Sequence, residues 1–387
     1  MGRRCTLIKF FCPFLFLFAN FSYICRKFSI MVEKIQIINY KSIVDLTLDL
    51  GRFNVIIGTN GCGKSNILEA VTMASAAHQN KLDTEFLLNR NIRVTEPTFM
   101  TNAFDDVEQA DNHIYMNING VDNQLYSINF NLFHQEKTKT WKNFIEEAAT
   151  LPPDSKTVKY GMFQVVAVVE EFASFLSYRP VENLLREVKD SPIYPLGIRG
   201  EGLMQYLKTI STNEEYRELF LKINEGLKML DWFDGFNIPD GLLSNEYKLS
   251  IGDKFLKDSL HHFDQRSTNE GFLYLLFFLT LFNSKDTPQF FAVDNIETSF
   301  NPGLCQNLTK YLVKTTKENN KQVILTTHNP FVLDGMDLSD DEVRLFVCRR
   351  DIDGHTKIER VKYREDRKMS LSELWMSGLI GALPDNF

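Results

Sequence analysis

Two short stretches of the sequence contain residue types that bind and act on phosphate groups. The first is GTNGCGKS at 58–65, which fits the pattern GxxxxGK[ST] and stands between a strand-like run and a helix-like run. Glycines at this spacing let backbone N–H groups turn toward phosphate oxygens, and the N-terminus of the following helix adds partial positive charge. The stretch therefore predicts a phosphate-binding loop, and the alternative is a chance glycine-rich turn.

Within this loop the residue types imply separate roles. Lys64 is expected to reach the outer phosphates as a point charge, and the Ser65 hydroxyl is expected to be a ligand of Mg²⁺. The other loop residues expected to line the nucleotide are Gly58, Asn60, Gly61, Gly63 and Asn66. We therefore expect ATP and Mg²⁺ as cofactors.

The second stretch is FFAVDNIETSFNP, in which an apolar run ends at Asp294 and is followed by Asn295 and Glu297. A carboxylate at the end of a buried strand can hold Mg²⁺ through water, so Asp294 and Ser65 form the expected metal pair. His328 ends another apolar run, KQVILTTH, where it could contact a γ-phosphate. Alone, such an acid is more often a cap or turn residue, and such a histidine is usually structural.

The elements that must position these residues alternate between strand patterns and helix patterns. Strand or hairpin patterns cover 33–40, 44–50, 52–58, 112–133, 289–294, 321–328 and 342–363. Helix patterns cover 65–79, 200–235, the region near 303–317 and a short C-terminal segment. The run 270–282 is apolar all round but too short to span a membrane, so it predicts a buried helix. The sequence predicts an α/β fold.

Composition narrows the class of protein. The 387 residues contain 50 acids and 43 bases, a net charge of −7 that argues against a protein coating nucleic acid without sequence preference. The six cysteines include no CxxC pair, so neither a zinc knuckle nor a disulfide framework is indicated. A reducing, cytoplasmic location is expected.

Residues 1–30 differ from the rest, because they contain five Lys or Arg residues and no acid. Their apolar run, 10–25, includes a proline and an asparagine and is shorter than the roughly 20 residues that span a bilayer. We expect translation to begin at Met31, which leaves residues 1–30 outside the working protein. A membrane anchor and a secretory signal without a clear cleavage site are the alternatives.

Three segments together carry a resemblance to a known family. GTNGCGKS, FFAVDNIETSFNP and VILTTHNPFVLDG resemble the ABC-type ATPase heads of the RecF, SMC and OLD-like group, and the opening IQIINYKSI is similar in pattern. Within that group, the chain most resembles stand-alone ATPases often encoded beside a nuclease-like partner in prokaryotic anti-phage systems. The resemblance covers most of 31–387 and is weak across 134–250. It implies a P-loop NTPase fold with a mixed central sheet, an antiparallel β subdomain and a mainly helical insertion at about 134–250.

The resemblance also implies roles for residues that the motifs do not reach. Lys41 and Ser42 match residues near the nucleotide. Gly271 matches the signature glycine, and Asn269 stands where a serine is usual; an amide could still donate to a γ-phosphate. In such heads the signature contacts the ATP of a second subunit. A head-to-tail dimer with two buried ATP molecules is therefore expected.

A departure from the family lies next to the metal-holding acid. There the family has a second acid that polarises the attacking water, and this chain has Asn295. An amide orients water but accepts no proton at neutral pH, so slow ATP hydrolysis is expected. Glu297 is the possible substitute, which gives Asn295, Glu297 and His328 as catalytic candidates.

The leading hypothesis is an ATP-driven switch that dimerises and gates a partner, a nuclease or toxin, in phage defence or DNA repair. One alternative is a RecF-like ATPase that loads on DNA. The other is the ATPase subunit of a membrane transporter, against which the missing LSGGQ-like signature and the long insertion argue. ATP-dependent DNA binding without a partner protein would distinguish the first alternative.

Overall fold

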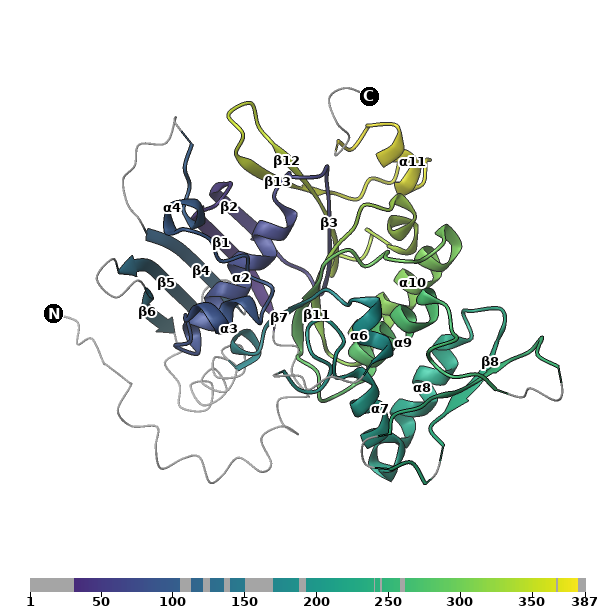
Figure 1. Cartoon of the computed structure of the whole chain (residues 1–387). Coiled ribbons are helices and arrows are strands. Elements are labelled where there is room, and N and C mark those ends of the chain that lie inside the picture. The colour runs from purple at the N-terminus through teal and green to yellow at the C-terminus, as the bar shows by residue number, and fades with distance from the viewer. Residues whose placement is uncertain are drawn as a thin grey trace, which may run out of the picture.

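The computed structural model describes residues 31–104, 113–120, 126–135, 140–149, 170–187, 193–239, 241–243, 246–257, 262–366 and 368–381. Figure 1 shows a central sheet between an antiparallel sheet with its helices and a larger helical region. Residues 1–30 lie outside the described residues, so the expectations for them remain predictions. Among the helices of the described ranges, none is both long and apolar enough to cross a membrane.

The central sheet has the order β13-β12-β3-β11-β10-β7. Its strands are β3 (Phe53–Ile57), β7 (Leu176–Tyr178), β10 (Phe290–Val293), β11 (Gln322–Thr326), β12 (Val343–Arg350) and β13 (Thr356–Val361). All neighbours pair in parallel except β12 and β13. Every residue of β3, β10 and β11 is buried, because parallel strands covered on both faces have no solvent side. Their mainly apolar composition follows from this position.

Helices cover the two faces of this sheet. They are α2 (Lys64–His78) on one face and α9 (Glu270–Asn283) and α10 (Pro302–Glu318) on the other. The side chains of β3 alternate accordingly, with Val55 and Ile57 in the core under α9 and α10, and Ile56 in the core under α2. The predicted buried helix over 270–282 is confirmed, since Phe272 to Phe282 are all buried in α9.

An antiparallel sheet packs against α2 with the order β2-β1-β4-β5-β6. Its strands are β1 (Val32–Tyr40), β2 (Ile43–Asp49), β4 (His113–Gly120), β5 (Tyr126–Gln135) and β6 (Thr140–Ala149). Burial alternates along β4, as in a sheet with one face in water. The hairpin predicted over 112–133 is confirmed by the pairing of β4 with β5.

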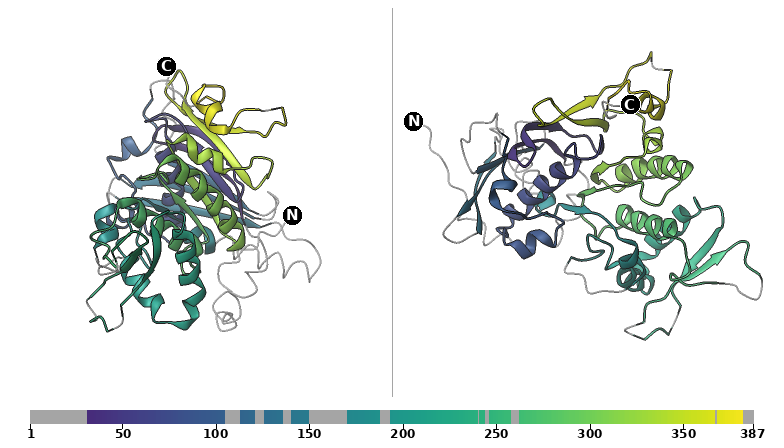
Figure 2. Two further views of the ribbon diagram at one scale, coloured as in Figure 1. Left: turned by 90° about the vertical axis from the view of Figure 1, so that its right-hand side faces the viewer. Right: turned by 45° about the horizontal axis from the view of Figure 1, so that its top comes forward.

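The range 134–250, expected as a mainly helical insertion, contains both helices and strands. Its elements after β6 and β7 are α6 (Glu182–Arg186), α7 (Leu203–Ser211), η3 (Glu214–Tyr216), α8 (Arg217–Leu227), β8 (Phe233–Asn237) and the start of β9 (Ser250–Asp253). β6 joins the antiparallel sheet and β7 joins the central sheet. Helices α6 and α8 pack on α9, and a Cβ at Gly226 of α8 would lie 2.5 Å from Leu279. The right-hand view of Figure 2 shows this green region on the side of the central sheet away from the antiparallel layer.

The remaining elements are short. They are α3 (Thr84–Leu88), α4 (Pro97–Met100), η5 (Pro330–Gly335) and α11 (Leu371–Met376). The last of these packs on η5 through the buried side chains of Leu374 and Trp375, and the hydroxyl of Ser372 donates to Asp334 over 2.7 Å. The C-terminal helix therefore lies against the segment that follows the strand of His328.

Candidate functional site

The phosphate-binding loop (58–65) joins β3 to α2 at the carboxyl edge of the central sheet. Its glycines are required by close neighbours. A Cβ at Gly58 would lie 2.1 Å from the carbonyl oxygen of Cys348, and a Cβ at Gly63, where φ is +113°, would lie 2.2 Å from Thr356 Oγ1. Gly63 is also the N-cap of α2, and no side chain caps the first N–H groups of this helix. Uncapped N–H groups at a helix N-terminus favour an anion.

Lys64 places a positive charge inside the loop. Only 6% of the residue is exposed, and Nζ donates to the carbonyl oxygens of Gly58 at 2.7 Å and Thr59 at 3.0 Å. A phosphate group in the loop therefore meets a cation that is already in place. Phosphate binding by Lys64 stays a prediction.

Ser65 and Asp294 lie side by side although 229 positions separate them. The Ser65 hydroxyl donates to Asp294 Oδ2 over 3.3 Å. Thr326 Oγ1 donates to Oδ1 over 2.5 Å, because β11 lies between β3 and β10 and ends beside Asp294. A buried carboxylate and a hydroxyl are oxygen ligands of the kind that Mg²⁺ prefers, so this pair fits the expected metal.

Asn295 is held by its backbone. Its φ is +59°, a left-handed conformation that asparagine adopts more readily than most residues. Its N–H donates to Thr326 Oγ1 over 2.9 Å, and its carbonyl oxygen accepts from Thr298. Thr326 thus couples Asn295 to Asp294, and the position that follows the metal-holding acid carries an amide.

The two carboxylate oxygens of Glu297 differ in their hydrogen bonding. Oε1 accepts the backbone N–H of His328 over 2.8 Å. Oε2 is buried and has no hydrogen-bond partner within the described part of the chain. A buried carboxylate oxygen normally has a donor, so this atom is a position for a water molecule or a ligand.

His328 stands at the carboxyl end of β11, close to the charged residues of the site. Partial burial, followed by Lys64, lowers the pKa of His328, while Glu297 and Asp294 oppose the shift. The imidazole is therefore neutral at pH 7, and a neutral imidazole can donate one N–H to a phosphate oxygen. The structure brings His328 together with Lys64, Asp294 and Glu297.

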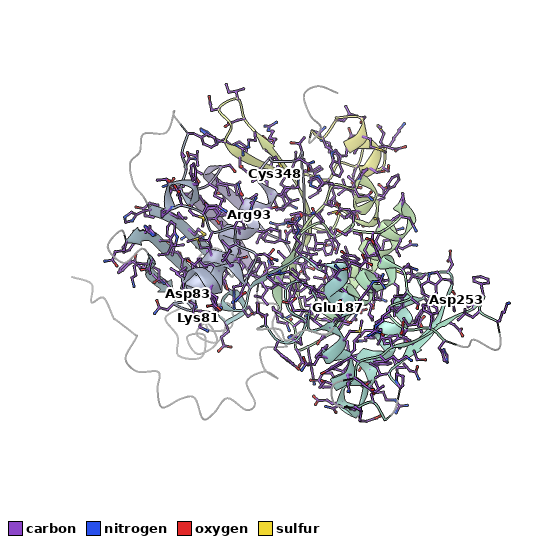
Figure 3. All side chains as sticks on the ribbon, viewed as in Figure 1. Lys81, Asp83, Arg93, Glu187, Asp253 and Cys348 are labelled. Carbon is purple, nitrogen blue, oxygen red and sulfur yellow. The ribbon has the colours of Figure 1, made fainter. Side chains whose placement is uncertain are left out.

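Lys41 and Ser42 belong to a hydrogen-bonded network on the flank of α2. Lys41 Nζ contacts Glu69 Oε2 at 2.5 Å, and Arg93 Nε contacts Oε1 of the same carboxylate at 2.5 Å. Burial is the main cause that lowers the pKa of Lys41. Two cations share one buried acid, so one positive charge remains beside the loop. The Arg93 side chain (Figure 3) is 63% exposed.

The network continues from Arg93 into the phosphate-binding loop. Arg93 donates to Asn66 Oδ1 over 2.8 Å, and Asn66 donates to Ser42 Oγ over 2.7 Å. Ser42 Oγ lies 2.7 Å from Thr356 Oγ1, which donates to the carbonyl oxygen of Cys62 over 2.9 Å. Glu69, Arg93 and Thr356 carried no motif, because only tertiary packing brings them to the loop.

Two family models match the sequence. The one described as AAA ATPase domain matches residues 31–167, and the one described as AAA domain, putative AbiEii toxin, Type IV TA system matches residues 238–334. Together they span the phosphate-binding loop and Asp294. No curated protein sequence matches the chain significantly.

Solved structures of SMC heads share the fold. A crystal structure of an SMC head bound to the C-winged helix domain of ScpA has a TM-score of 0.56 at 15% identity, and the match covers 87% of this chain and 99% of that one. A second structure shows an SMC head with an extended coiled coil bound to the C-terminal domain of ScpA from Pyrococcus furiosus. It has a TM-score of 0.55 at 12% identity, and the match covers 91% of this chain and 99% of that one. The two family models and the fold of the SMC heads together support an ATPase of the ABC or AAA type in the SMC- and RecF-like group. The predicted P-loop NTPase fold is therefore confirmed.

In this ATPase head, Asn269 and Gly271 lie away from the phosphate-binding loop. Asn269 Oδ1 accepts the N–H of Phe272 over 2.9 Å and so caps α9, and a Cβ at Gly271 would lie 3.2 Å from the carbonyl oxygen of Ser299. Because α9 and α2 cover opposite faces of the central sheet, the chain does not bring these residues to its own loop (Figure 1).

Arg179 is a candidate that the sequence did not indicate. It follows β7 directly, and the N–H of Asp294 donates to the carbonyl oxygen of Tyr178 over 2.9 Å. Arg179 is exposed and lies at the same sheet edge as Asp294. In the sequence, Arg179 stands in the stretch YRPVENLLR. The strand before it, β7, has only three residues, which is too short to show a periodic pattern.

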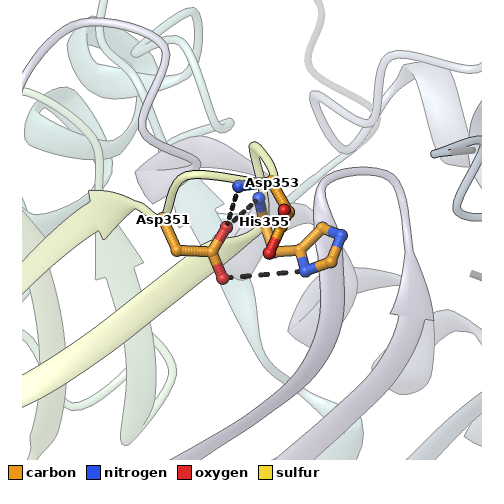
Figure 4. Close-up of side chains that lie close together, drawn as sticks. All are labelled: Asp351, Asp353 and His355. Atoms are coloured by element: carbon orange, nitrogen blue, oxygen red, sulfur yellow. Dashed lines mark hydrogen bonds and ion pairs between the residues drawn. The ribbon is translucent and has the colours of Figure 1, made fainter. Parts of the chain in front are cut away.

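The hairpin of β12 and β13 contacts the phosphate-binding loop through Arg350 and Thr356, and it carries a cluster of side chains of metal-ligating types. Asp351, Asp353 and His355 bring their ligand atoms within 4.8 Å of one another (Figure 4). Asp351 Oδ1 accepts the N–H groups of Asp353 and His355, and Oδ2 lies 3.6 Å from His355 Nδ1. Lys357 lies 3.8 Å from the same carboxylate. These contacts account for the cluster as the closure of a turn, and we assign it no metal.

Proposed function

We propose that this ATPase head hydrolyses ATP slowly, dwells in an ATP-bound dimer and in that state acts as a switch for a partner effector, a nuclease or toxin. Phage defence and DNA repair are the settings that the family resemblance favours. The observation that carries the proposal is the contrast between a fully equipped phosphate-binding loop and an amide, Asn295, beside the metal-holding acid.

The chain's residues would divide the chemistry as follows. Bound Mg²⁺ would neutralise charge on the transferring phosphoryl group, and Ser65 and Asp294 would hold it. Lys64 binds the outer phosphates, and the neutral His328 donates an N–H to the terminal one. Asn295 orients the attacking water through its carbonyl oxygen but takes no proton. Positioning and electrostatic stabilisation therefore remain without general-base catalysis, which leaves a low rate.

Dimerisation is supported by the placement of the signature residues. Asn269 and Gly271 stand on the far side of the central sheet from the loop of the same chain. In a head-to-tail dimer they would meet the ATP bound by the partner, and two ATP molecules would be buried between the heads. Hydrolysis then separates the heads, so a slow rate lengthens the life of the dimer.

Engagement of a partner protein is supported by the comparisons. The SMC heads that share this fold are bound to domains of ScpA, and one family model is described as a putative AbiEii toxin. We infer that the nucleotide state of this head controls its contact with another protein.

Light scattering on the purified chain tests the switch. With Mg·ATP the chain should run as a dimer for longer than one turnover, and Lys64→Ala should remain a monomer. A monomer in saturating ATP would contradict the proposal. ATP-dependent binding to DNA without any other protein would instead favour the RecF-like alternative.

A further inference from the structure

Two cysteines meet behind the phosphate-binding loop. Cys62 lies within the loop, and Cys348 lies on β12 (Figure 3), whose register places its neighbour Val347 opposite Ile57 of β3. Both are buried, with 1% and 0% of each residue exposed. The Cys348 thiol lies 3.4 Å from the carbonyl oxygen of Cys62, to which it donates.

Gly58 marks how closely the two residues approach. A Cβ built there would lie 2.7 Å from Cys62 Sγ and 2.1 Å from the carbonyl oxygen of Cys348. Each of the two thiols shifts the pKa of the other, as expected for sulfur atoms that lie close together. The Cys62 side chain and the backbone of Cys348 therefore pack against the same glycine.

A cation activates one thiol of the pair. Lys64 Nζ lies 3.8 Å from Cys62 Sγ. The Cys348 thiol is the largest cause, and Lys64 a further one, that lower the pKa of Cys62 to about 6. The Cys348 thiol has its pKa raised by Cys62 and by burial. A thiolate next to a protonated thiol is the arrangement of an attacking and a resolving cysteine.

We propose that Cys62 and Cys348 form a reversible disulfide, made by hydrogen peroxide, that closes the phosphate-binding loop to ATP. The Cys62 thiolate attacks the peroxide oxygen, which breaks the O–O bond and gives a sulfenic acid and, after one proton is taken up, water. The Cys348 thiol then attacks the Cys62 sulfur, and the sulfenic oxygen leaves as a second water. A dithiol returns both thiols and is itself oxidised to a disulfide.

The disulfide acts on the residues that bind phosphate. It would tie the side chain of Cys62 to β12, and Cys62 stands between the two glycines whose N–H groups must turn toward the nucleotide. Oxidation of Cys62 and binding of ATP also compete for Lys64, because its ammonium cannot stabilise the thiolate and bind a phosphate at the same time. Asn60 and Gly61 are exposed, so a molecule as small as hydrogen peroxide can approach through the loop.

The effect on ATP rests on the proposed function, and the experiment separates the two. The full chain is used with Cys5, Cys12 and Cys25 replaced by serine, which leaves the three described cysteines. It is treated with hydrogen peroxide, digested without reduction and analysed by mass spectrometry, and Mg·ATP affinity is measured by calorimetry before oxidation, after it and after dithiothreitol. We expect a linked Cys62–Cys348 peptide, an at least tenfold loss of affinity and its recovery on reduction. Mg·ATP present during oxidation should slow the linkage.

Two variants serve as controls. Cys305 is also buried, but burial raises its pKa to about 12, so Cys305→Ser should respond to peroxide as its parent does. Cys348→Ser should bind ATP normally when reduced and form no linked peptide, and dimedone should then trap a sulfenic acid on Cys62. A reduced chain that binds ATP but forms no Cys62–Cys348 link overturns the inference, and so does a linked chain with unchanged affinity. A reduced chain that fails to bind Mg·ATP overturns the proposed function instead, since the linked peptide is detected without nucleotide.

Discussion

The phosphate-binding loop and the sheet edge that carries Asp294 face the same nucleotide site, yet they are equipped differently. On the loop side, the cations are held by partners already in place: Lys64 by two backbone carbonyls, and Lys41 and Arg93 by one buried carboxylate. A chain of hydrogen bonds from Arg93 to Thr356 fixes the loop from outside. Binding therefore needs little rearrangement of the protein.

On the edge side, the carboxylates of Asp294 and Glu297 already accept hydrogen bonds from the protein. Both oxygens of Asp294 accept hydroxyl hydrogen bonds, and Glu297 accepts the N–H of His328. Asn295, between them, cannot accept a proton. The comparison indicates that tight binding and slow hydrolysis have separate structural origins, so single substitutions should change one without the other.

The largest effect is expected on the loop side. Lys64→Ala removes a buried cation that forms charge-assisted hydrogen bonds, so affinity for Mg·ATP should fall by about a hundredfold or more. Isothermal calorimetry measures the affinity. Lys310→Ala, an exposed lysine of α10, is the matched control and should leave affinity unchanged. Equal affinities for the Lys64 variant and the control would remove the basis of the ATP-binding assignment.

The next effect is expected on the edge side. Asn295→Glu supplies a proton acceptor, and general-base catalysis is worth roughly 10²- to 10⁴-fold, so steady-state phosphate release should rise at least tenfold. Affinity for ATP should stay the same, because the loop is untouched. Since φ at this position is +59°, glutamate there costs about 1–3 kcal/mol of stability, and Asn295→Asp, which tolerates that conformation better, is the matched variant. An unchanged rate in both variants, with normal melting temperatures, would contradict the slow-switch proposal.

A smaller effect is expected at Glu297. Because Oε1 is held by the backbone of His328, Glu297→Gln should lower turnover by less than about threefold, well below the effect of Lys64→Ala. The competing outcome follows from the buried Oε2, which has no partner in the described ranges and could accept a proton from water. A wild-type rate of several per second that Glu297→Gln abolishes would make Glu297 the base and would end the slow-switch proposal.

Much of the fold could be predicted from the sequence because its central strands are buried on both faces. β3, β10 and β11 are mainly apolar for that reason, and each is followed within two positions by a residue of the candidate site, Gly58, Asp294 or His328. β6 was not predicted, since of its described side chains only Trp141 and Ile145 face the core, and Lys142, Asn143 and the exposed Phe144 stand between them. Its strand character depends on pairing with β5 more than on its own composition.

The candidate site divides in the same way. The local motif residues 58–66 were identified because their chemistry depends on spacing along the chain. Glu69, Arg93, Thr356 and Arg179 were not, because each reaches the site only through contacts with segments distant in sequence. Lys41 was expected near the nucleotide, but its ammonium faces Glu69 in the structure. A resemblance carried over position by position gives a residue's place and leaves the direction of its side chain open.

The smallest effect tests whether the loop and the edge share one electrostatic site. His328 has a pKa lowered by partial burial and by Lys64, and raised in part by Glu297 and Asp294. Removing a nearby positive charge makes protonation easier, so Lys64→Met should raise the pKa of His328, whereas Glu297→Gln removes a negative charge and should lower it. The imidazole resonances of ¹³C- and ¹⁵N-labelled protein, titrated between about pH 5 and 8, report both shifts.

Because the folded-state pKa of His328 is depressed, the unfolded chain binds more protons at this residue, and the contribution of His328 to stability falls as the pH drops below the pKa of an unfolded histidine. Lys64→Met should therefore lessen that acid sensitivity and Glu297→Gln should deepen it. Shifts of the opposite signs, or a shift in neither variant, would show that Lys64 and Glu297 do not face His328, and the loop and the edge would then have to be treated as separate sites.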